Sequence, residues 1–172
     1  VYHIMQDAGI IDGYLVPCYD VLHTFSKEYI VEDLVSYMRK NGVFCASSNE
    51  MDAIYYEQAE EFGKWIGKTE RTLVYGGARK GLMESVAKSV KENGGQVFGV
   101  VPQKLVRNNM VSDHIDITFH CDALSDRKQW LIGESDIMVA LPGSMGTLDE
   151  AFSAMAENTF GLHQKKVIFW NI

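Results

Sequence analysis

Short apolar runs alternate with amphipathic stretches from residue 42 to the end of the chain. The runs are apolar at successive positions, as expected of strands that helices cover on both faces in a parallel sheet. The stretches between them carry apolar residues every three or four positions, which is the helical period. This alternation predicts an α/β fold, a Rossmann-like doubly wound parallel sheet with helices on both faces. The expected strands are 42–46, 72–75, 96–101, 115–119, 137–141 and 166–170.

Three of the intervening stretches place their apolar residues on one face, the face that an amphipathic helix turns toward the core. The first stripe is Tyr55, Ala59, Phe62 and Ile66, the second is Met83, Val86, Ala87 and Val90, and the third is Leu148, Phe152, Met155, Thr159 and Leu162. The second helix is expected to end at Asn93-Gly94-Gly95, because glycine and asparagine are frequent just after a helix C-terminus.

Residues 1–41 have a different pattern. A helical stretch in this part carries apolar residues at Val21, Leu22, Phe25, Ile30, Leu34 and Tyr37. The chain has no internal repeat, low-complexity tract or interdomain linker. We therefore expect a single domain over 1–172, in which an N-terminal helical segment (1–41) precedes a nucleotide-binding α/β core (42–172).

The composition narrows the classes of partner. Sixteen Lys and Arg against 23 Asp and Glu give a formal charge of −7, which argues against a protein that coats nucleic acid or an anionic membrane. A local phosphate site is compatible with that charge, because backbone N–H groups and one or two basic side chains suffice. The three Cys residues lack CxxC spacing, which favours reduced thiols in a cytoplasmic protein. We expect no metal and no cofactor, since no ligand spacing is present.

Glycines concentrate where two predicted strands turn into helices. Gly76-Gly77-Ala78-Arg79-Lys80-Gly81 follows the second strand, and Pro142-Gly143-Ser144-Met145-Gly146-Thr147 follows the fifth. Glycine lets the backbone approach a ligand closely, and a helix N-terminus offers unpaired N–H groups to an anion. Open α/β sheets bind ligands at this edge, so the two loops suggest a nucleotide or sugar-phosphate cleft. Each loop alone is equally compatible with a tight turn, and neither matches GxGxxG or GxxxxGK[ST].

Two charged features near these loops also have ordinary structural explanations. Thr147-x-x-Glu150 fits a capping box, with Thr147 as N-cap and Glu150 in the first helical turn. Spacing alone favours the cap, whereas the position of Glu150 at the mouth of a glycine loop favours a site. Asp126-Arg127-Lys128 is typical, by composition, of a solvated charged turn.

Taken in order along the chain, these motifs resemble those of the LOG family, the cytokinin riboside 5′-monophosphate phosphoribohydrolases. The matching positions are Tyr75-Gly-Gly-x-x-x-Gly81-Leu82-Met83, Arg127-Lys128 and Pro142-Gly-x-x-Gly146-Thr147-x-x-Glu150. Cys45-Ala46-Ser47-Ser48 and Gly94-Gly95-x-Val97-x-Gly99-Val100-x-Pro102 support them. The resemblance covers residues 42–172.

The resemblance implies hydrolysis of the N-glycosidic bond of a nucleoside 5′-monophosphate to free base and ribose 5-phosphate, without a metal. The substrate would be a cytokinin riboside monophosphate or AMP-like, and Arg127 and Glu150 would be the catalytic pair. The substrate- and phosphate-binding positions that it implies are Ser47, Gly77, Gly81, Leu82, Met83, Lys128, Pro142, Gly143, Ser144, Gly146 and Thr147. It also implies a homodimer with the site near the interface. The residue types suit this chemistry, because a carboxylate stabilises positive charge on the ribose and arginine is a rigid fork donor.

Some positions depart from the family pattern, and we expect them to affect the identity of the substrate more than the fold. Ser144 and Ala78 stand where glycine is usual, and Leu124-Ser125-Asp126 precedes Arg127 in place of the usual lead. Two alternatives therefore stay open. One is a non-catalytic nucleotide- or molybdenum-cofactor-binding protein on the same fold, and the other is a regulatory dimer with a degenerate site.

The N-terminal segment resembles a piece that the family normally carries after its last strand. Asp12-Gly13-Tyr14-x-x-Pro17, followed by Val21-Leu22 and Phe25, is the similar stretch. We hypothesise that this helix takes the place of the family's C-terminal helix, as in a circular permutant. The hypothesis predicts that residues 18–30 lie beside the strand at 166–170, and its alternative is an unrelated helical extension.

Overall fold

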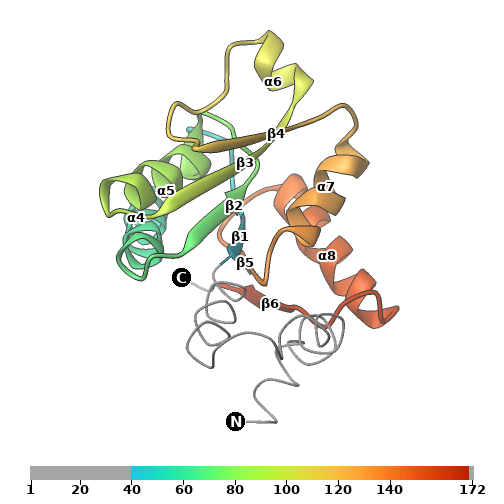
Figure 1. Ribbon diagram of the computed structural model, residues 1–172. Coiled ribbons are helices and arrows are strands. Elements are labelled where there is room, and N and C mark those ends of the chain that lie inside the picture. The colour runs from blue at the N-terminus through green and yellow to red at the C-terminus, as the bar shows by residue number, and fades with distance from the viewer. Residues whose placement is uncertain (1–39, 171–172) are drawn as a thin grey trace, which may run out of the picture.

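The computed structural model describes residues 40–170, which form one six-stranded sheet with helices on both faces (Figure 1). The strands are β1 (Lys40–Phe44), β2 (Thr72–Tyr75), β3 (Gln96–Pro102), β4 (Ile117–Cys121), β5 (Ile137–Ala140) and β6 (Lys166–Phe169). The helices are α4 (Ala53–Lys68), α5 (Gly81–Glu92), α6 (Gln103–Arg107), α7 (Leu124–Gly133) and α8 (Met145–Thr159). The strand order is β4-β3-β2-β1-β5-β6 and every neighbouring pair is parallel. The predicted Rossmann-like doubly wound sheet is confirmed.

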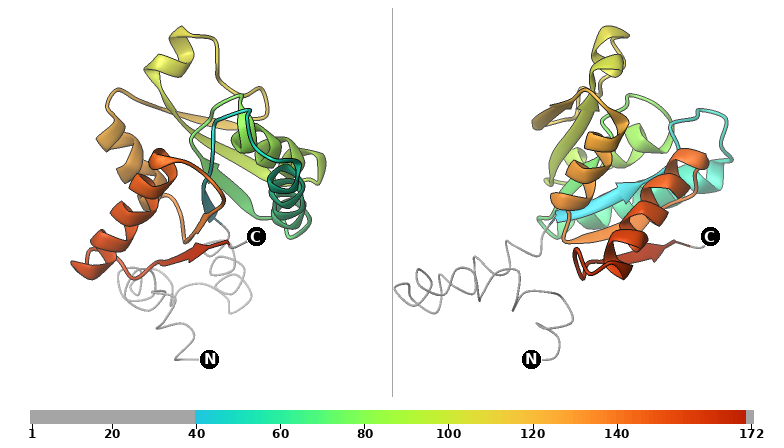
Figure 2. Two further views of the ribbon diagram at one scale, coloured as in Figure 1. Left: turned by 180° about the vertical axis from the view of Figure 1, so that it is seen from behind. Right: turned by 90° about the vertical axis from the view of Figure 1, so that its right-hand side faces the viewer.

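The sheet separates two hydrophobic cores. Helices α4 and α5 lie on one face, and α7 and α8 lie on the other (Figure 1, Figure 2). Successive residues of a strand point to opposite faces. In β2, therefore, Leu73 and Tyr75 belong to the core under α4 and α5, whereas Val74 belongs to the core under α7 and α8. All three are completely buried, which explains why β2 is apolar at successive positions.

Two of the three predicted helical stripes pack as expected, and the third does not. The stripe of α5 is buried throughout. In the stripe of α4, Ala59, Phe62 and Ile66 are buried and Tyr55 is half-buried. In α8 the buried residues are Thr147, Glu150, Ala151 and Ala154. The stripe predicted to face the core is outside instead, with Leu148 40%, Phe152 57% and Met155 41% exposed. The helical period identifies an apolar face, but it does not say whether the sheet or another surface covers that face.

Two strands begin earlier or later than the apolar runs suggest. β1 begins at Lys40 and ends at Phe44, so Cys45 and Ala46 lie outside the strand. The Ala46 N–H donates to the carbonyl of Pro142 at 3.1 Å, which joins the end of β1 to the loop after β5. β4 is shifted to Ile117–Cys121, because its pairing with β3 starts where Ile117 lies opposite Phe98.

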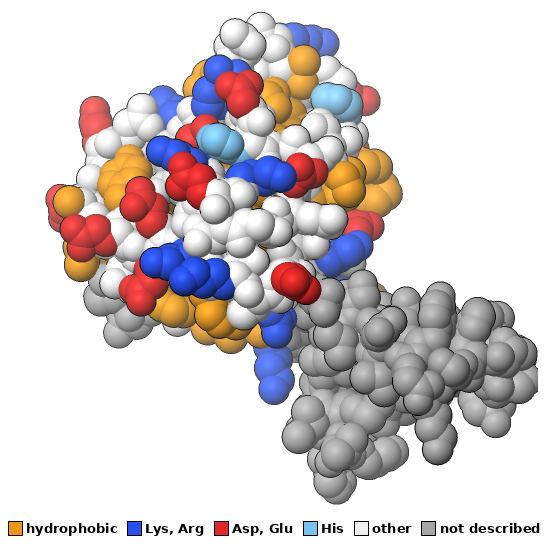
Figure 3. Space-filling model, turned by 60° about the vertical axis from the view of Figure 1, so that its left-hand side comes forward, with side chains coloured by type: hydrophobic (Ala, Val, Ile, Leu, Met, Phe, Trp, Pro, Cys, Tyr) orange, Lys and Arg blue, Asp and Glu red, His pale blue; other side chains and the backbone are white. Residues whose placement is uncertain are grey.

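The outside of the molecule carries both signs of charge. Over the side that includes α4 and α5, acidic and basic side chains are interspersed (Figure 3). Within residues 40–170, no helix combines the length and the apolar character needed to cross a bilayer. The predicted helical segment, and the predicted position of residues 18–30 beside β6, fall outside the described residues and stay predictions.

Candidate active site

Three loops meet at the carboxyl edge of the sheet, because β2, β1 and β5 are neighbours in it. They follow β1 (residues 45–52), β2 (76–80) and β5 (141–144). The Met83 N–H donates to the carbonyl of Ala46 at 3.3 Å, and the Gly81 N–H donates to the Asn49 side-chain oxygen at 2.9 Å. Strand order reverses at β1, so the loops converge where doubly wound sheets place their ligand site.

Arg127 and Glu150 form a buried ion pair at this edge. The Arg127 Nη1 atom lies 2.5 Å from Glu150 Oε1, and the two side chains are only 13% and 6% exposed. Arg127 comes from α7 and Glu150 from α8. Burial raises the pKa of Glu150, and the Arg127 charge and hydrogen bond partly offset that rise. Because removing two charges from water is unfavourable, a buried pair of this kind is weak support for a purely stabilising role.

One buried donor of Arg127, its Nε atom, has no hydrogen-bond partner among the described residues. Buried donors in proteins are nearly always satisfied, so an orphan of this kind calls for a specific explanation. The guanidinium can therefore hold Glu150 with one nitrogen and direct a second N–H at an anionic or hydroxyl oxygen.

Gly76 provides the space in which Arg127 lies, and the sequence analysis did not assign it a role. A Cβ at residue 76 would stand 1.8 Å from Arg127 Nη2, so any other residue would displace the guanidinium. The signal in the sequence was the Gly76-Gly77 pair. That signal could not show which side chain approaches, because Arg127 is distant along the chain.

The capping-box interpretation of Glu150 is wrong. Helix α8 begins at Met145 with Ser144 as N-cap, so Thr147 is inside the helix and Glu150 is in its second turn. Thr147 is instead buried against the preceding loop, where a Cβ at residue 143 would lie 2.0 Å from its hydroxyl oxygen. Glu150 pairs with Arg127 and is not needed to satisfy the helix N-terminus.

Lys128 lies beside the ion pair and holds α7 to α8. Its Nζ atom donates to Asp149 Oδ1 at 2.9 Å and to Ser153 Oγ at 3.1 Å. These contacts fix the register of the two helices that carry Arg127 and Glu150. The predicted solvated turn is thus partly wrong, because Arg127 and Lys128 both make contacts with α8.

The other predicted site residues differ in how they reach the loop surface. Ser47, Gly143, Ser144 and Gly146 are exposed, and Pro142 is half-buried. Leu82 is completely buried and Met83 is 7% exposed, so both pack in the core under α4 and α5. Gly77 and Gly81 have φ of 76° and 57°. A Cβ at residue 81 would also stand 2.3 Å from the carbonyl oxygen of Ser48, so glycine is required where these two loops touch.

Cys45 is a buried thiol beside the ion pair. Burial, with a further contribution from the Glu150 charge, raises its pKa far above the usual range. A thiol in this environment stays protonated, and the thiolate is the nucleophilic form. Cys45 therefore packs against the site and does not react. Among residues 40–170, no three His, Cys, Asp or Glu side chains come together as a metal site.

Comparisons with known proteins show the family of this chain. The model of the SLOG cluster4 family matches residues 39–169, which is most of the chain. A Mycobacterium tuberculosis protein named cytokinin riboside 5′-monophosphate phosphoribohydrolase is 36% identical over 126 residues, covering 73% of this chain and 67% of that protein. The chain belongs to the LOG family. Residues 1–41 match a separate model, described as a protein of unknown function (DUF3791).

Other LOG relatives and solved structures extend the likeness. A rice protein (Oryza sativa subsp. japonica) named probable cytokinin riboside 5′-monophosphate phosphoribohydrolase LOGL9 is 36% identical over 137 residues, which are 80% of this chain. This chain spans 60% of that protein's length. The Moco carrier protein of Chlamydomonas reinhardtii has the same fold, with a TM-score of 0.64, 27% identity and coverage of 76% of this chain and 74% of that one. The molybdenum cofactor binding protein of Rippkaea orientalis gives a TM-score of 0.65, 26% identity and the same coverage.

Proposed function

We propose that this protein hydrolyses the N-glycosidic bond of a nucleoside 5′-monophosphate, a cytokinin riboside monophosphate or AMP-like, releasing free base and ribose 5-phosphate. The observation that carries the proposal is the buried Arg127–Glu150 pair at the meeting point of three loops. The names of the LOG relatives support the same reaction. In this proposal water attacks C1′, the C1′–N bond breaks, and one proton of the water ends on the departing base.

Glu150 stabilises the reacting sugar in this mechanism. Breaking the C1′–N bond places positive charge on the ribose ring, as in other glycosidic hydrolyses. A carboxylate held in a water-poor site stabilises that charge more strongly than it would in bulk water. Arg127 holds Glu150 in place and favours its ionised form, since its charge and hydrogen bond partly offset the rise in pKa that burial causes. The unpaired Nε donor of Arg127 would bind the phosphate or a ribose hydroxyl.

The N-terminus of α8 is the proposed phosphate site. Its loop residues Gly143, Ser144 and Gly146 are exposed, and the Ser144 side chain makes no capping hydrogen bond. The first N–H groups of a helix lack intrahelical partners and attract anions. The Ser144 hydroxyl adds one more donor at the position where the family pattern has glycine.

Base release from a nucleotide tests the proposed reaction. The purified chain is incubated with AMP and, separately, with isopentenyladenosine monophosphate, and the products are separated by chromatography. We expect free base and ribose 5-phosphate in equal amounts, with no release from the corresponding nucleosides. Absence of release from every nucleoside monophosphate tried would contradict the proposal.

A homodimer that pairs the exposed face of α8 is part of the proposal. Met145, Leu148, Phe152 and Met155 lie on one side of this helix and are 40–78% exposed. Contiguous apolar surface on a folded protein usually marks an interaction site. Because the same helix carries Glu150 on its inner face, a partner there would lie next to the catalytic pair.

Sedimentation of two matched variants tests the dimer. Phe152→Glu places a charge on the outer face of α8, and Ile54→Glu places one on α4, where the side chain is 46% exposed. We expect Phe152→Glu alone to give monomers and to lose base release. Equal sedimentation of both variants and the wild type would contradict this interface.

A carrier function is the second candidate, and the Moco carrier and Moco-binding neighbours favour it. A carrier needs the loops but has no use for a buried carboxylate beside the sugar. Tight nucleotide or molybdenum-cofactor binding without base release would support the carrier.

A cytoplasmic location also belongs to the proposal, and the free, buried thiols of Cys45 and Cys121 fit a reducing compartment.

A further inference from the structure

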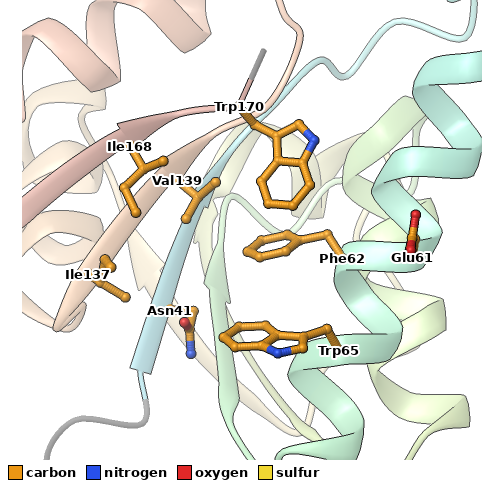
Figure 4. Close-up of a pocket in the computed structure, with 8 residues that line it drawn as sticks. All are labelled: Asn41, Glu61, Phe62, Trp65, Ile137, Val139, Ile168 and Trp170. Atoms are coloured by element: carbon orange, nitrogen blue, oxygen red, sulfur yellow. The ribbon is translucent and has the colours of Figure 1, made fainter. Parts of the chain in front are cut away.

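A groove of about 360 Å³ opens between α4 and the β5–β6 part of the sheet. Its walls are almost entirely apolar, from Phe62 and Trp65 of α4 and from Ile137, Val139, Ile168 and Trp170 of the sheet side (Figure 4). The groove lies on the face of α4 and α5, whereas Arg127 and Glu150 belong to helices on the other face. It is therefore not part of the proposed active site.

The groove exposes large apolar side chains of the kind that a helix normally covers on the face of a parallel sheet. Trp65 is 46%, Ile168 42% and Trp170 39% exposed. The Phe62 ring lies between two indoles, with centroids 5.8 Å from Trp65 and 5.3 Å from Trp170. Among the helices of residues 40–170, α8 packs against β6, and it does so from the opposite face. Parallel sheets are covered by helices on both faces, so this side of β6 lacks a helix within the described residues.

We propose that residues 18–37 of this same chain fill the groove with their apolar face. Ile30, Leu34 and Tyr37 are spaced by four and three positions, which places them on one side of a helix. Asn41, the second residue of β1, lines the groove, so the chain reaches this segment directly from one end of the groove. Residues 38 and 39 are left as the connection, which is within the usual range of about two to six residues for a helix-to-strand turn.

The length and the covalent connection favour this segment over a separate molecule. Twenty helical residues extend about 30 Å, whereas a four-residue strand such as β6 extends about 13 Å, so part of the segment suffices to cover the groove. A short tether holds a segment near its site at an effective concentration on the order of millimolar. A second copy or a free ligand has no such advantage. This inference does not rest on the proposed hydrolysis.

Photo-crosslinking in the full chain tests the occupant. The photoreactive residue p-benzoylphenylalanine replaces Trp65 in the groove and, as a matched control, Phe152 on α8. Isotopically light and heavy chains are mixed before irradiation, and the crosslinked peptides are identified by mass spectrometry. From position 65 we expect crosslinks to peptides within 18–37, only between equal labels and with a yield that does not change on dilution. From position 152 we expect none to that segment.

Two charged variants identify the face that docks. Leu34→Asp places a charge on the apolar face, and Ser36→Asp places the same charge nearby but outside the set of apolar positions. We expect Leu34→Asp to abolish the crosslink from position 65 and to increase quenching of groove tryptophan fluorescence by acrylamide, while Ser36→Asp changes neither. Crosslinks between light and heavy chains would assign the groove to a second copy and overturn the proposal. Absence of any crosslink to 18–37, or equal behaviour of the two variants, would overturn it as well.

Discussion

Helices α5 and α8 each follow a glycine-containing loop at the carboxyl edge of the sheet, but only α8 buries a charged residue. The inner face of α5 is apolar, and Val86, Ala87 and Val90 are completely buried. The inner face of α8 combines Ala151 and Ala154 with Thr147 and Glu150, and the large apolar side chains of this helix are exposed. Polar residues are rarely buried unless another group pairs with them. The difference separates a helix that packs mainly in the core from one that also carries the proposed catalytic glutamate and the proposed dimer surface.

Removal of Arg127 should have the largest effect on this contrast. Arg127→Ala leaves the Glu150 carboxylate buried without its cation, which we expect to lower the free energy of unfolding by about 3–5 kcal/mol and to abolish base release. Lys91→Ala removes one cation from an exposed pair with Asp116. It should change the free energy of unfolding by less than about 1 kcal/mol. Urea unfolding of both variants measures the difference. Equal losses of unfolding free energy in the two variants would mean that the buried pair contributes no more to stability than an exposed pair.

Truncation of aliphatic side chains should separate the two helical layers. Ile66 on α4 is completely buried, so Ile66→Ala should lower the free energy of unfolding by about 2–5 kcal/mol. Leu148 on α8 is 40% exposed, so Leu148→Ala should change monomer stability by only about 0.5 kcal/mol and should weaken self-association instead. Urea unfolding of both variants, at a protein concentration too low for the proposed dimer to form, measures monomer stability. Sedimentation measures the self-association of Leu148→Ala. A large loss of monomer stability in Leu148→Ala would show that α8 is oriented differently.

A methyl group at Gly76 should displace Arg127 without removing any charge from the site. Because a Cβ would overlap Arg127 Nη2, we expect Gly76→Ala to lower kcat/KM on the order of 100-fold. Gly133→Ala is the control, since a Cβ there meets nothing within 4 Å and the residue has no positive φ. Steady-state kinetics of both variants distinguishes them. Full activity of Gly76→Ala would indicate that the position of Arg127 does not matter.

The burial of Glu150 should also have a smaller effect, on the pH dependence of kcat/KM. Burial raises the pKa of Glu150 from its ordinary value of 4.5, so the ionised form is lost at a higher pH than for an exposed glutamate. The acid limb of kcat/KM should therefore lie above pH 4.5. The Asp149 charge contributes to the rise, so Asp149→Asn should move this limb downward. An acid limb at the same pH in both proteins would show that another group controls it.

The sequence predicts the fold well because the sheet strands are apolar on both faces. It also predicts the inner faces of α4 and α5, because the helical spacing of their apolar residues shows which side of each helix is apolar. It fails for α8, since the pattern cannot say whether Phe152 faces the sheet or the outside. The contact of Gly76 with Arg127 was also out of reach, because it joins residues far apart in the chain. The motif order named the pair Arg127 and Glu150, but only the structure brings them within 2.5 Å.

Glu150→Gln is the most direct test of the central claim that the buried pair performs hydrolysis. The substitution keeps the side-chain shape and an acceptor for Arg127 but removes the negative charge. Adenine release from AMP, AMP binding and the unfolding midpoint are measured on the same preparations of variant and wild type. We expect release to fall by about 1,000-fold or more while the variant still folds and binds AMP. The unfolding midpoint should also fall, because the buried Arg127 charge loses its counter-charge. Adenine release at the wild-type rate by a folded Glu150→Gln variant would contradict the claim.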